Sequence, residues 1–231
     1  MLPVMTWEPS LSHSHMRVFQ NGFSVTSDSP SYFNSSRSDY ALLPGHIYYF
    51  EVSLELQGGL EVKVGVTQAQ ELENEVGFSG TKKGWSFYAG QGGQKRHNMN
   101  SGAFPYGKVV GTQATVGVLV DMKDGRIGFV IDGEWCGFAF TKPEFVCIEP
   151  VYAAFSLLAY NNTCTFLKQH SSWTSTRSFL YLRKHTAFFR RLPDGLFREI
   201  GTYLLLKAEP LPRSLILDLQ SQPVDPSSSQ E

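Results

Sequence analysis

The segment from Asp121 to Phe140 contains two Asp-Gly pairs, Asp124-Gly125 and Asp132-Gly133, each between apolar residues. Asp-Gly is the strongest short signal for a tight β-hairpin, because glycine adopts positive φ without steric cost and aspartate tolerates it. The flanking apolar runs are Ala114–Val120, Ile127–Ile131 and Trp135–Phe140. The segment therefore predicts three short antiparallel strands in a meander.

Short apolar runs separated by Gly, Pro, Asn, Asp and Ser extend from about Phe19 to Leu167, which is typical of strands. The further candidate strands are Phe23–Val25, His46–Leu54, Leu60–Val66, Gly84–Tyr88, Pro150–Phe155 and Thr163–Leu167. Trp85 and Trp135 fall inside strand patterns, so we expect both rings in the core. Many short strands with little helix between them predict an all-β sandwich of two antiparallel sheets.

The pattern changes after Trp173. Ser178 to Leu192 places apolar residues three and four positions apart, which predicts a helix with a broad apolar face. Shorter helices are expected at Leu196–Leu206 and Arg213–Leu219. We therefore expect a β domain over residues 17–168, a small C-terminal α-helical appendage over 174–220, and a Pro- and Ser-rich disordered tail over 221–231.

Composition argues against several classes of function. The formal net charge is -1 and no Lys- and Arg-dense run occurs, so we expect no nucleic-acid partner. No stretch of about 18 apolar residues and no secretion signal is found, so we expect no membrane association. The cysteines Cys136, Cys147 and Cys164 are odd in number and form no Cys-x-x-Cys pair, which favours reduced thiols and a cytoplasmic protein.

The sequence offers no catalytic constellation. Gly-x-Ser-x-Gly is absent, and no pattern places a nucleophile next to a base. His13 and His15 have no ligand partners in register, and turn chemistry explains the aspartates of the meander better than calcium binding. We therefore expect no catalytic residue, no metal and no cofactor, and a protein that is not an enzyme.

Residues 17–168 resemble the SPRY domain family, and the matching segments occur in the family's order. These segments are Leu43–Val52, Val62–Thr67, Gly84–Phe87, Phe104–Gly107, Gly117–Asp121, Gly125–Glu134, Gly137–Phe140 and Glu149–Tyr152. The related neuralized homology domain shares part of the pattern, but the spacing of Ile-Asp-Gly-Glu and Gly-Phe-Ala-Phe favours SPRY. The resemblance implies a bent two-sheet antiparallel β-sandwich whose loops at one end bind short peptide segments without catalysis.

The resemblance also implies where a peptide would bind. Gly77-Phe78 matches the position where SPRY proteins with a SOCS box have an aromatic residue in the peptide site. The turn Ser156–Asn162 occupies the position of a second binding loop, but it does not match the family's Val-Trp-Gly, because it is longer and lacks the Trp; Tyr160 could supply an aromatic wall there. The early loop Ser27–Ser36 does not match. The predicted rim is residues 27–36, 77–82 and 156–162, and its predicted peptide-binding residues are Phe78, Ser156, Leu157, Tyr160 and Asn161.

The C-terminal segment resembles a SOCS box, which implies binding to Elongin B/C and a cullin. Ser178–Ala187 is similar to the first helix of that motif, with Arg183 in place of its Cys, and the implied Elongin-binding residues are Phe179, Leu182 and Ala187. Glu209–Leu219 is similar to the cullin box but lacks its first Leu and its Tyr. The implied cullin-binding residues are Pro210, Leu211, Pro212 and Leu215, a set that favours cullin-5. A competing similarity, of Leu192–Leu204 to an F-box, covers only the start of that motif.

Together these patterns predict a non-catalytic adaptor, in which the SPRY domain binds a substrate protein and the helical tail recruits a ubiquitin ligase. The main alternative is a stand-alone SPRY scaffold or recognition protein without ligase partners. A lectin-like sugar binder is a third possibility, but it requires a cluster of exposed acids, amides and aromatics that the sequence does not assemble.

Overall fold

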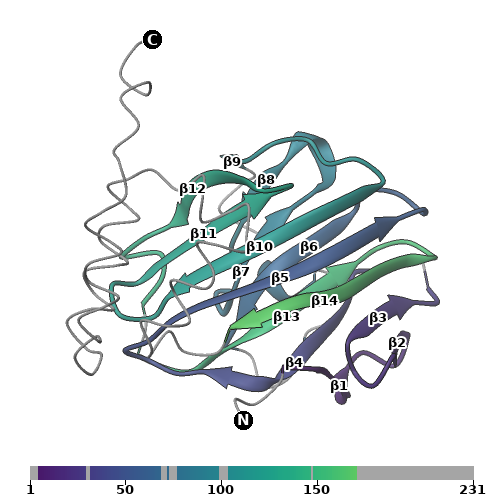
Figure 1. The fold of residues 1–231 in the computed structure, drawn as a ribbon, viewed down its shortest axis with the longest axis horizontal. Helices are drawn as coiled ribbons and strands as arrows, with labels where there is room; N and C mark the ends of the chain where they lie inside the picture. The colour runs from purple at the N-terminus through teal and green to yellow at the C-terminus, as the bar shows by residue number, and fades with distance from the viewer. Residues whose placement is uncertain are drawn as a thin grey trace, which may run out of the picture. The chain divides into compact units, whose positions relative to one another are not determined.

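The computed structural model describes residues 5–29, 32–68, 72, 77–98, 104–146 and 148–170. Chain contacts divide the protein into two units, Met1–Ser172 and Trp173–Glu231, and every described element belongs to the first. This unit consists of two seven-stranded antiparallel sheets that pack face to face (Figure 1). The two-sheet sandwich predicted from the sequence is therefore confirmed.

The sheet nearer the viewer in Figure 1, sheet B, contains the predicted meander. Its strands, in spatial order, are β12 (Glu134–Phe140), β11 (Arg126–Ile131), β10 (Gln113–Asp121), β5 (Ile47–Leu56), β14 (Asn162–His170), β3 (Ser24–Ser27) and β2 (Met16–Phe19). Strand β5 lies at its centre, between β10 and β14. Segments far apart in the sequence are thus adjacent in space.

The sheet behind it, sheet A, carries the surface described in the next subsection. Its strands, in spatial order, are β1 (Trp7–Ser12), β4 (Asn34–Leu42), β13 (Val151–Leu157), β6 (Val62–Thr67), β7 (Gly84–Tyr88), β8 (Gln94–Arg96) and β9 (Phe104–Pro105). Two 3-10 helices, η1 (Phe78–Gly80) and η2 (Gly90–Gly92), flank β7 in the sequence. No α-helix occurs in the part of the chain that the structure describes.

Both predicted hairpins of the meander are present. Between β11 and β12, Asp132 and Gly133 have φ values of 51° and 78°, the positive pair that a tight two-residue hairpin turn requires. Between β10 and β11, the Asp121 carboxylate accepts hydrogen bonds from the amides of Lys123 and Asp124 at 3.0 and 2.9 Å. These local bonds explain why the turns could be recognised from sequence alone.

A core of alternating side chains fills the space between the sheets. Strand β10 contributes Val116, Val118 and Val120, and β5 contributes Phe50 and Val52, all of them fully buried. The Trp7 ring stacks on that of Phe166 with centroids 4.2 Å apart. Strand β1 is thereby anchored to the core, although its sequence gave no strand signal.

The two tryptophans predicted to be core residues differ. Trp85 is buried in the core, and its indole N–H donates to the Glu144 carbonyl at 2.8 Å. For Trp135 the prediction is wrong, because its ring is only half-buried and lies on the outer face of sheet B. A Cβ atom on Gly128 would come within 2.2 Å of that ring, so the absence of a side chain there makes room for it.

The predicted helical appendage, residues 174–220, and the tail, residues 221–231, lie outside the described residues. Among the residues that are described, no helix is long and apolar enough to cross a membrane. Two of the three cysteines are described, and both Cys136 and Cys164 are free thiols.

Candidate functional site

A row of polar side chains crosses the outer face of sheet A. Ser35, Ser156, Lys63, Tyr88 and Gln94 occupy directly paired positions on β4, β13, β6, β7 and β8. Their neighbours along the strands, such as Val62, Val64 and Phe87, belong to the core. Because side chains alternate along a strand, this polar row faces outward.

Helix η1 lies against the same face and is fixed to it by hydrogen bonds. The Phe78 amide donates to Ser156 Oγ at 3.2 Å, and Ser156 Oγ lies 2.7 Å from Ser35 Oγ. Ser86 Oγ donates to Ser79 Oγ at 2.7 Å. Gly84 has no space for a side chain, since a Cβ there would lie 2.1 Å from the Phe78 carbonyl oxygen. The loop that carries Phe78 is therefore held in place by the sheet.

Beside η1, two cations lie on aromatic rings. Lys63 Nζ is 4.0 Å from the centroid of the Phe33 ring, and the Arg96 guanidinium is 5.1 Å from that of Tyr88. The Phe33 and Tyr88 rings meet edge to face at 6.2 Å. Phe33, Lys63, Tyr88 and Arg96 thus form one contiguous group, which we call the cation–aromatic cluster. Such contacts stabilise a charge most when water is excluded.

The electrostatics of this cluster are unusual for a surface. The pKa of Lys63 is lowered from 10.5 to about 8, mainly by burial and also by the positive charge of Arg96, while Glu61 acts in the opposite direction. The Tyr88 hydroxyl donates a hydrogen bond to Glu61. Arg96 Nε is buried and has no hydrogen-bond partner within the described ranges. Among the groups that act on Lys63 are therefore one like charge and one carboxylate that already accepts a hydrogen bond.

The loop after β13 forms one edge of this surface. Asn162 is fully buried, its side chain accepting from the Gly58 amide at 2.9 Å and donating to the Gly59 carbonyl at 2.7 Å. This tie holds the preceding turn, in which Asn161 adopts a φ of 58° and Tyr160 is 50% exposed. The Tyr160 ring is consequently available to a partner on a backbone that is held in place.

The five residues predicted to bind peptide divide into two groups. Phe78 is 2% exposed, Ser156 is fully buried beneath η1, and Leu157 packs in the core on the opposite side of β13. Their side chains support the loops and are not available at the surface. Tyr160 and Asn161 are exposed. Peptide binding at these positions stays a prediction, with direct contact restricted to the last two.

The other predicted site residues cannot be placed. Those assigned to Elongin and cullin lie outside the described residues: Phe179, Leu182, Ala187, Pro210, Leu211, Pro212 and Leu215. No group of three His, Cys, Asp or Glu side chains suited to a metal ion occurs within the described ranges. Burial raises the pKa of the Cys136 and Cys164 thiols, which disfavours the reactive thiolate at both.

Sequence reasoning did not find the cation–aromatic cluster. The alternation in Val62-Lys63-Val64 could have indicated an outward lysine, because a cation between two core valines must face the other way. Nothing in the sequence indicates that Phe33 and Tyr88 meet this lysine, since their proximity depends on how distant strands pair. The cluster is therefore a product of the fold.

Comparisons with known proteins agree with this architecture. The sequence matches the family model of the SPRY domain over residues 47–170, more than half of the 231 residues. No curated protein matches the sequence.

Solved structures resemble the fold at low sequence identity. The SPRY domain of human HERC1 matches with a TM-score of 0.57 and 18% identity, covering 70% of this chain and 97% of that one. The TRIM65 PSpry domain matches with a TM-score of 0.54 and 16% identity, covering 71% and 90%. Stonustoxin matches with a TM-score of 0.53 and 19% identity, covering 71% of this chain but 27% of its own. At these identities the likeness shows the fold alone. With the family model, it shows that the chain belongs to the SPRY domain family, a family of protein-interaction modules.

Proposed function

We propose that the outer face of sheet A binds an extended segment of another protein, and that the protein itself performs no catalysis. The observation that carries this proposal is the cation–aromatic cluster, where the half-buried Phe33 ring contacts Lys63 and meets the Tyr88 ring that Arg96 contacts. Aromatic rings next to cations are typical of recognition surfaces, in which Tyr, Phe and Arg are enriched.

The architecture supports this function because the surface is preorganised. Helix η1 is bonded to Ser156 and Ser86, and the 156–162 turn is tied through Asn162. A partner that binds between these loops does not have to order them, so less of the interaction free energy is lost on binding. The exposed Tyr160 supplies a large, rigid contact at the edge.

Selection from a library of random dodecapeptides displayed on phage, using the full-length protein as bait, tests this function. We expect enriched peptides that bind saturably with one site by calorimetry. Tyr160→Ala should weaken them about three- to tenfold, which corresponds to about 1 kcal/mol. Lys108→Met serves as a control, because Lys108, in the loop between β9 and β10, is outside the polar row and pairs with Glu134 of β12 at 3.2 Å. If no peptide is enriched, the proposed function fails.

As a second, finer proposal, the protein is an adaptor that brings its bound segment to a ubiquitin ligase. The support is the similarity of Ser178–Ala187 and Glu209–Leu219 to the two boxes of a SOCS box. Catalysis would then occur in the ligase, and the adaptor would raise the local concentration of substrate. We place this activity in the cytoplasm, where the three cysteines would stay reduced. The alternative remains a SPRY recognition protein that recruits no ligase.

Co-purification of the full-length protein with recombinant Elongin B/C separates the two alternatives. The adaptor proposal predicts a stable complex on size exclusion, its loss on Leu182→Asp, and selective loss of cullin-5 on Pro210→Ala combined with Pro212→Ala. A protein that stays separate from Elongin B/C would support the stand-alone alternative.

A further inference from the structure

Two exposed tyrosines lie at the same end of sheet A. Tyr32 is 52% exposed and Tyr160 is 50% exposed. Tyr32 precedes Asn34, the first residue of β4. Tyr160 follows Leu157, the last residue of β13, which pairs directly with Asn34. Because only a few residues and one strand spacing separate the two tyrosines, their Cα atoms lie within about 20 Å of each other.

The backbone at each tyrosine is held by a buried asparagine. Asn34 is 1% exposed, and its side-chain amide donates to the Tyr32 carbonyl at 3.2 Å. Asn162 holds the turn that carries Tyr160, and Gly58 packs against that turn, since a Cβ there would lie 2.1 Å from the Tyr160 carbonyl oxygen. A large ring on a fixed backbone loses little conformational entropy when it binds a partner.

The loops at this end of the sandwich attract no charged partner. These loops are residues 28–33, 57–61 and 157–162. They contain two charged residues, Asp28 and Glu61, and both have partners. Asp28 pairs with Arg17 at 2.8 Å, and Glu61 accepts the Tyr88 hydroxyl. The remaining residues of these loops are neutral, so charge complementarity favours a segment that is itself uncharged.

The strands at this end have no unpaired edge. Strand β4 is paired with β1 and β13, and β13 is paired with β4 and β6. A peptide that adds to a sheet as a further strand needs such an edge. An amphipathic helix needs an apolar groove, whereas the exposed neighbours of the tyrosines include Gln57 and Asn161. A segment bound here therefore has a backbone that is neither helical nor paired with a strand.

We propose that the bound segment is uncharged and rich in proline, and that its prolines pack in the polyproline II conformation on Tyr32 and Tyr160. The inference rests on the proposed function and names the chemical class of its partner. Polyproline II has no internal hydrogen bonds, so its carbonyls can accept from the tyrosine hydroxyls and from the exposed Asn161 amide. Surfaces lined by aromatic rings are the usual receptors of this conformation.

Sequencing of the peptides enriched in the phage selection tests the inference. We expect prolines three positions apart, because three residues complete one turn of polyproline II. Replacing these prolines by alanine in a synthetic peptide should weaken binding about tenfold or more. Raising the NaCl concentration from about 50 to about 500 mM should change the affinity less than about twofold, because the contact is uncharged.

Variants of the protein locate the contact. Tyr32→Ala and Tyr160→Ala should each weaken the proline peptide about three- to tenfold and have little effect on its alanine version. The matched control is Phe104→Ala, because Phe104 is 50% exposed on β9, at the opposite edge of sheet A, and its removal should leave both affinities unchanged. Thermal melting of each variant verifies the fold, and Tyr32→Phe and Tyr160→Phe, which keep the ring, should retain most of the affinity.

The outcomes separate the two proposals. Enriched peptides without proline, or a proline contribution that survives both Tyr32→Ala and Tyr160→Ala, would overturn the proline-segment inference while leaving peptide binding intact. A selection that enriches nothing would remove both proposals.

Discussion

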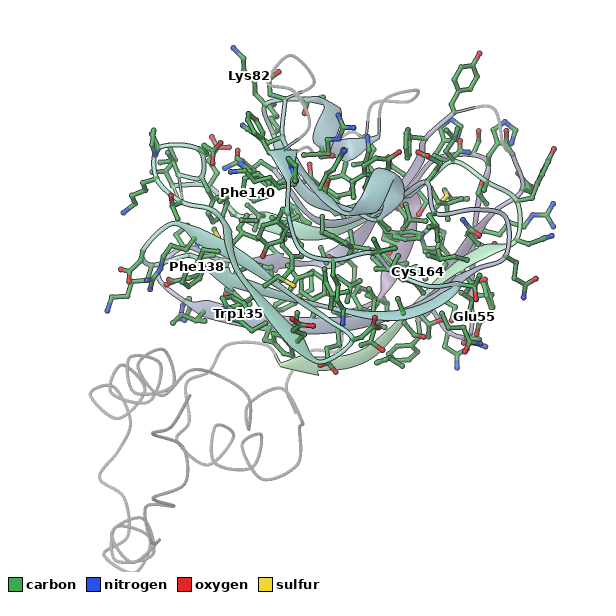
Figure 2. All side chains as sticks on the ribbon, turned by 90° about the horizontal axis from the view of Figure 1, so that it is seen from above. Glu55, Lys82, Trp135, Phe138, Phe140 and Cys164 are labelled. Atoms are coloured by element: carbon green, nitrogen blue, oxygen red, sulfur yellow. The ribbon has the colours of Figure 1, made fainter. Side chains whose placement is uncertain are left out.

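On the outer face of each sheet, a cation lies on an aromatic ring. The charged groups around that cation differ between the two faces. On sheet B the Arg126 guanidinium lies 4.8 Å from the Phe138 ring centroid and donates to Asp121 at 2.7 Å and to Asp124 at 2.9 Å. On sheet A, Lys63 lies near a second cation, Arg96, which lowers its pKa, and near Glu61, which raises it. In Figure 2, Trp135 and Phe138 lie on the side of the sandwich away from Lys82, and Cys164 lies inside it.

Under the proposed function, this difference separates a structural face, on sheet B, from a recognition face, on sheet A. Arg126 compensates Asp121, whose other oxygen closes the β10–β11 turn, so this ion pair stabilises the meander. Lys63 has a pKa near 8, which means that the folded protein disfavours its charge. A residue kept where it costs stability is a candidate for function.

The largest expected effect on stability comes from removing an aromatic side chain, Phe78 beside sheet A or Phe138 on sheet B. Phe78→Ala should lower the free energy of unfolding by about 3–5 kcal/mol, because the ring is 2% exposed and its removal leaves a cavity. Phe138→Ala, at a half-buried position on sheet B, should cost about 1 kcal/mol. Chemical denaturation of both variants measures the difference. Equal losses would mean that η1 is not packed as described.

The second prediction is that removing a cation changes the free energy of unfolding in opposite directions on the two faces. Arg126→Met should lower the free energy of unfolding by about 1–2 kcal/mol at pH 7, because it leaves the buried Asp121 without its cation. Lys63→Met should raise it by about 1–2 kcal/mol, because the folded state no longer holds a disfavoured charge. Denaturant titrations at one pH test both variants, and two losses of the same size would remove the distinction between the faces.

The third prediction is the pH dependence of the Lys63 effect. The pKa of Lys63 is about 8 in the folded protein and 10.5 as its ordinary value. Between these two values the unfolded chain binds more protons, so the wild type gains stability as pH rises. The advantage of Lys63→Met should therefore be full below pH 8 and should shrink towards pH 10.5. A constant difference from pH 7 to pH 10 would contradict the lowered pKa.

The smallest stability effect is expected at the edge of the surface. Tyr160→Ala should change the free energy of unfolding by less than about 0.5 kcal/mol, because half of the side chain is exposed and Asn162 holds the turn. Asn162→Ala, the matched buried change in the same turn, should cost about 2 kcal/mol. A large loss for Tyr160→Ala would show that the ring is structural.

The features that could be predicted from sequence are local ones. The hairpins at Asp124-Gly125 and Asp132-Gly133 depend on turn residues and their immediate neighbours. Strand β4 was not predicted, since its polar sequence Asn34–Leu42 shows no apolar alternation even though its serines are buried. The prediction that the Trp135 ring is in the core was wrong because β12 pairs irregularly with β11, and Gly137 has a φ of 88°. Such irregularities change which face a side chain occupies.

The candidate site was predictable only at its edges. The family motif drew attention to Phe78 and the 156–162 turn, but not to the residues between them. Ser35 and Ser156 are 121 residues apart in sequence, and Lys63 reaches them only through the pairing of β6 with β13. Register among distant strands is not encoded in any short segment, so a surface built from five strands requires the fold to be known.

The central claim is that the outer face of sheet A, and not that of sheet B, contacts the partner. Backbone NMR of the isotope-labelled full-length protein, titrated with a peptide enriched in the selection, tests it most directly. The account predicts shifted amide signals at Lys63, Tyr88 and Tyr160, with those of Arg126 and Trp135 unchanged. Shifts confined to β10, β11 and β12 would contradict it.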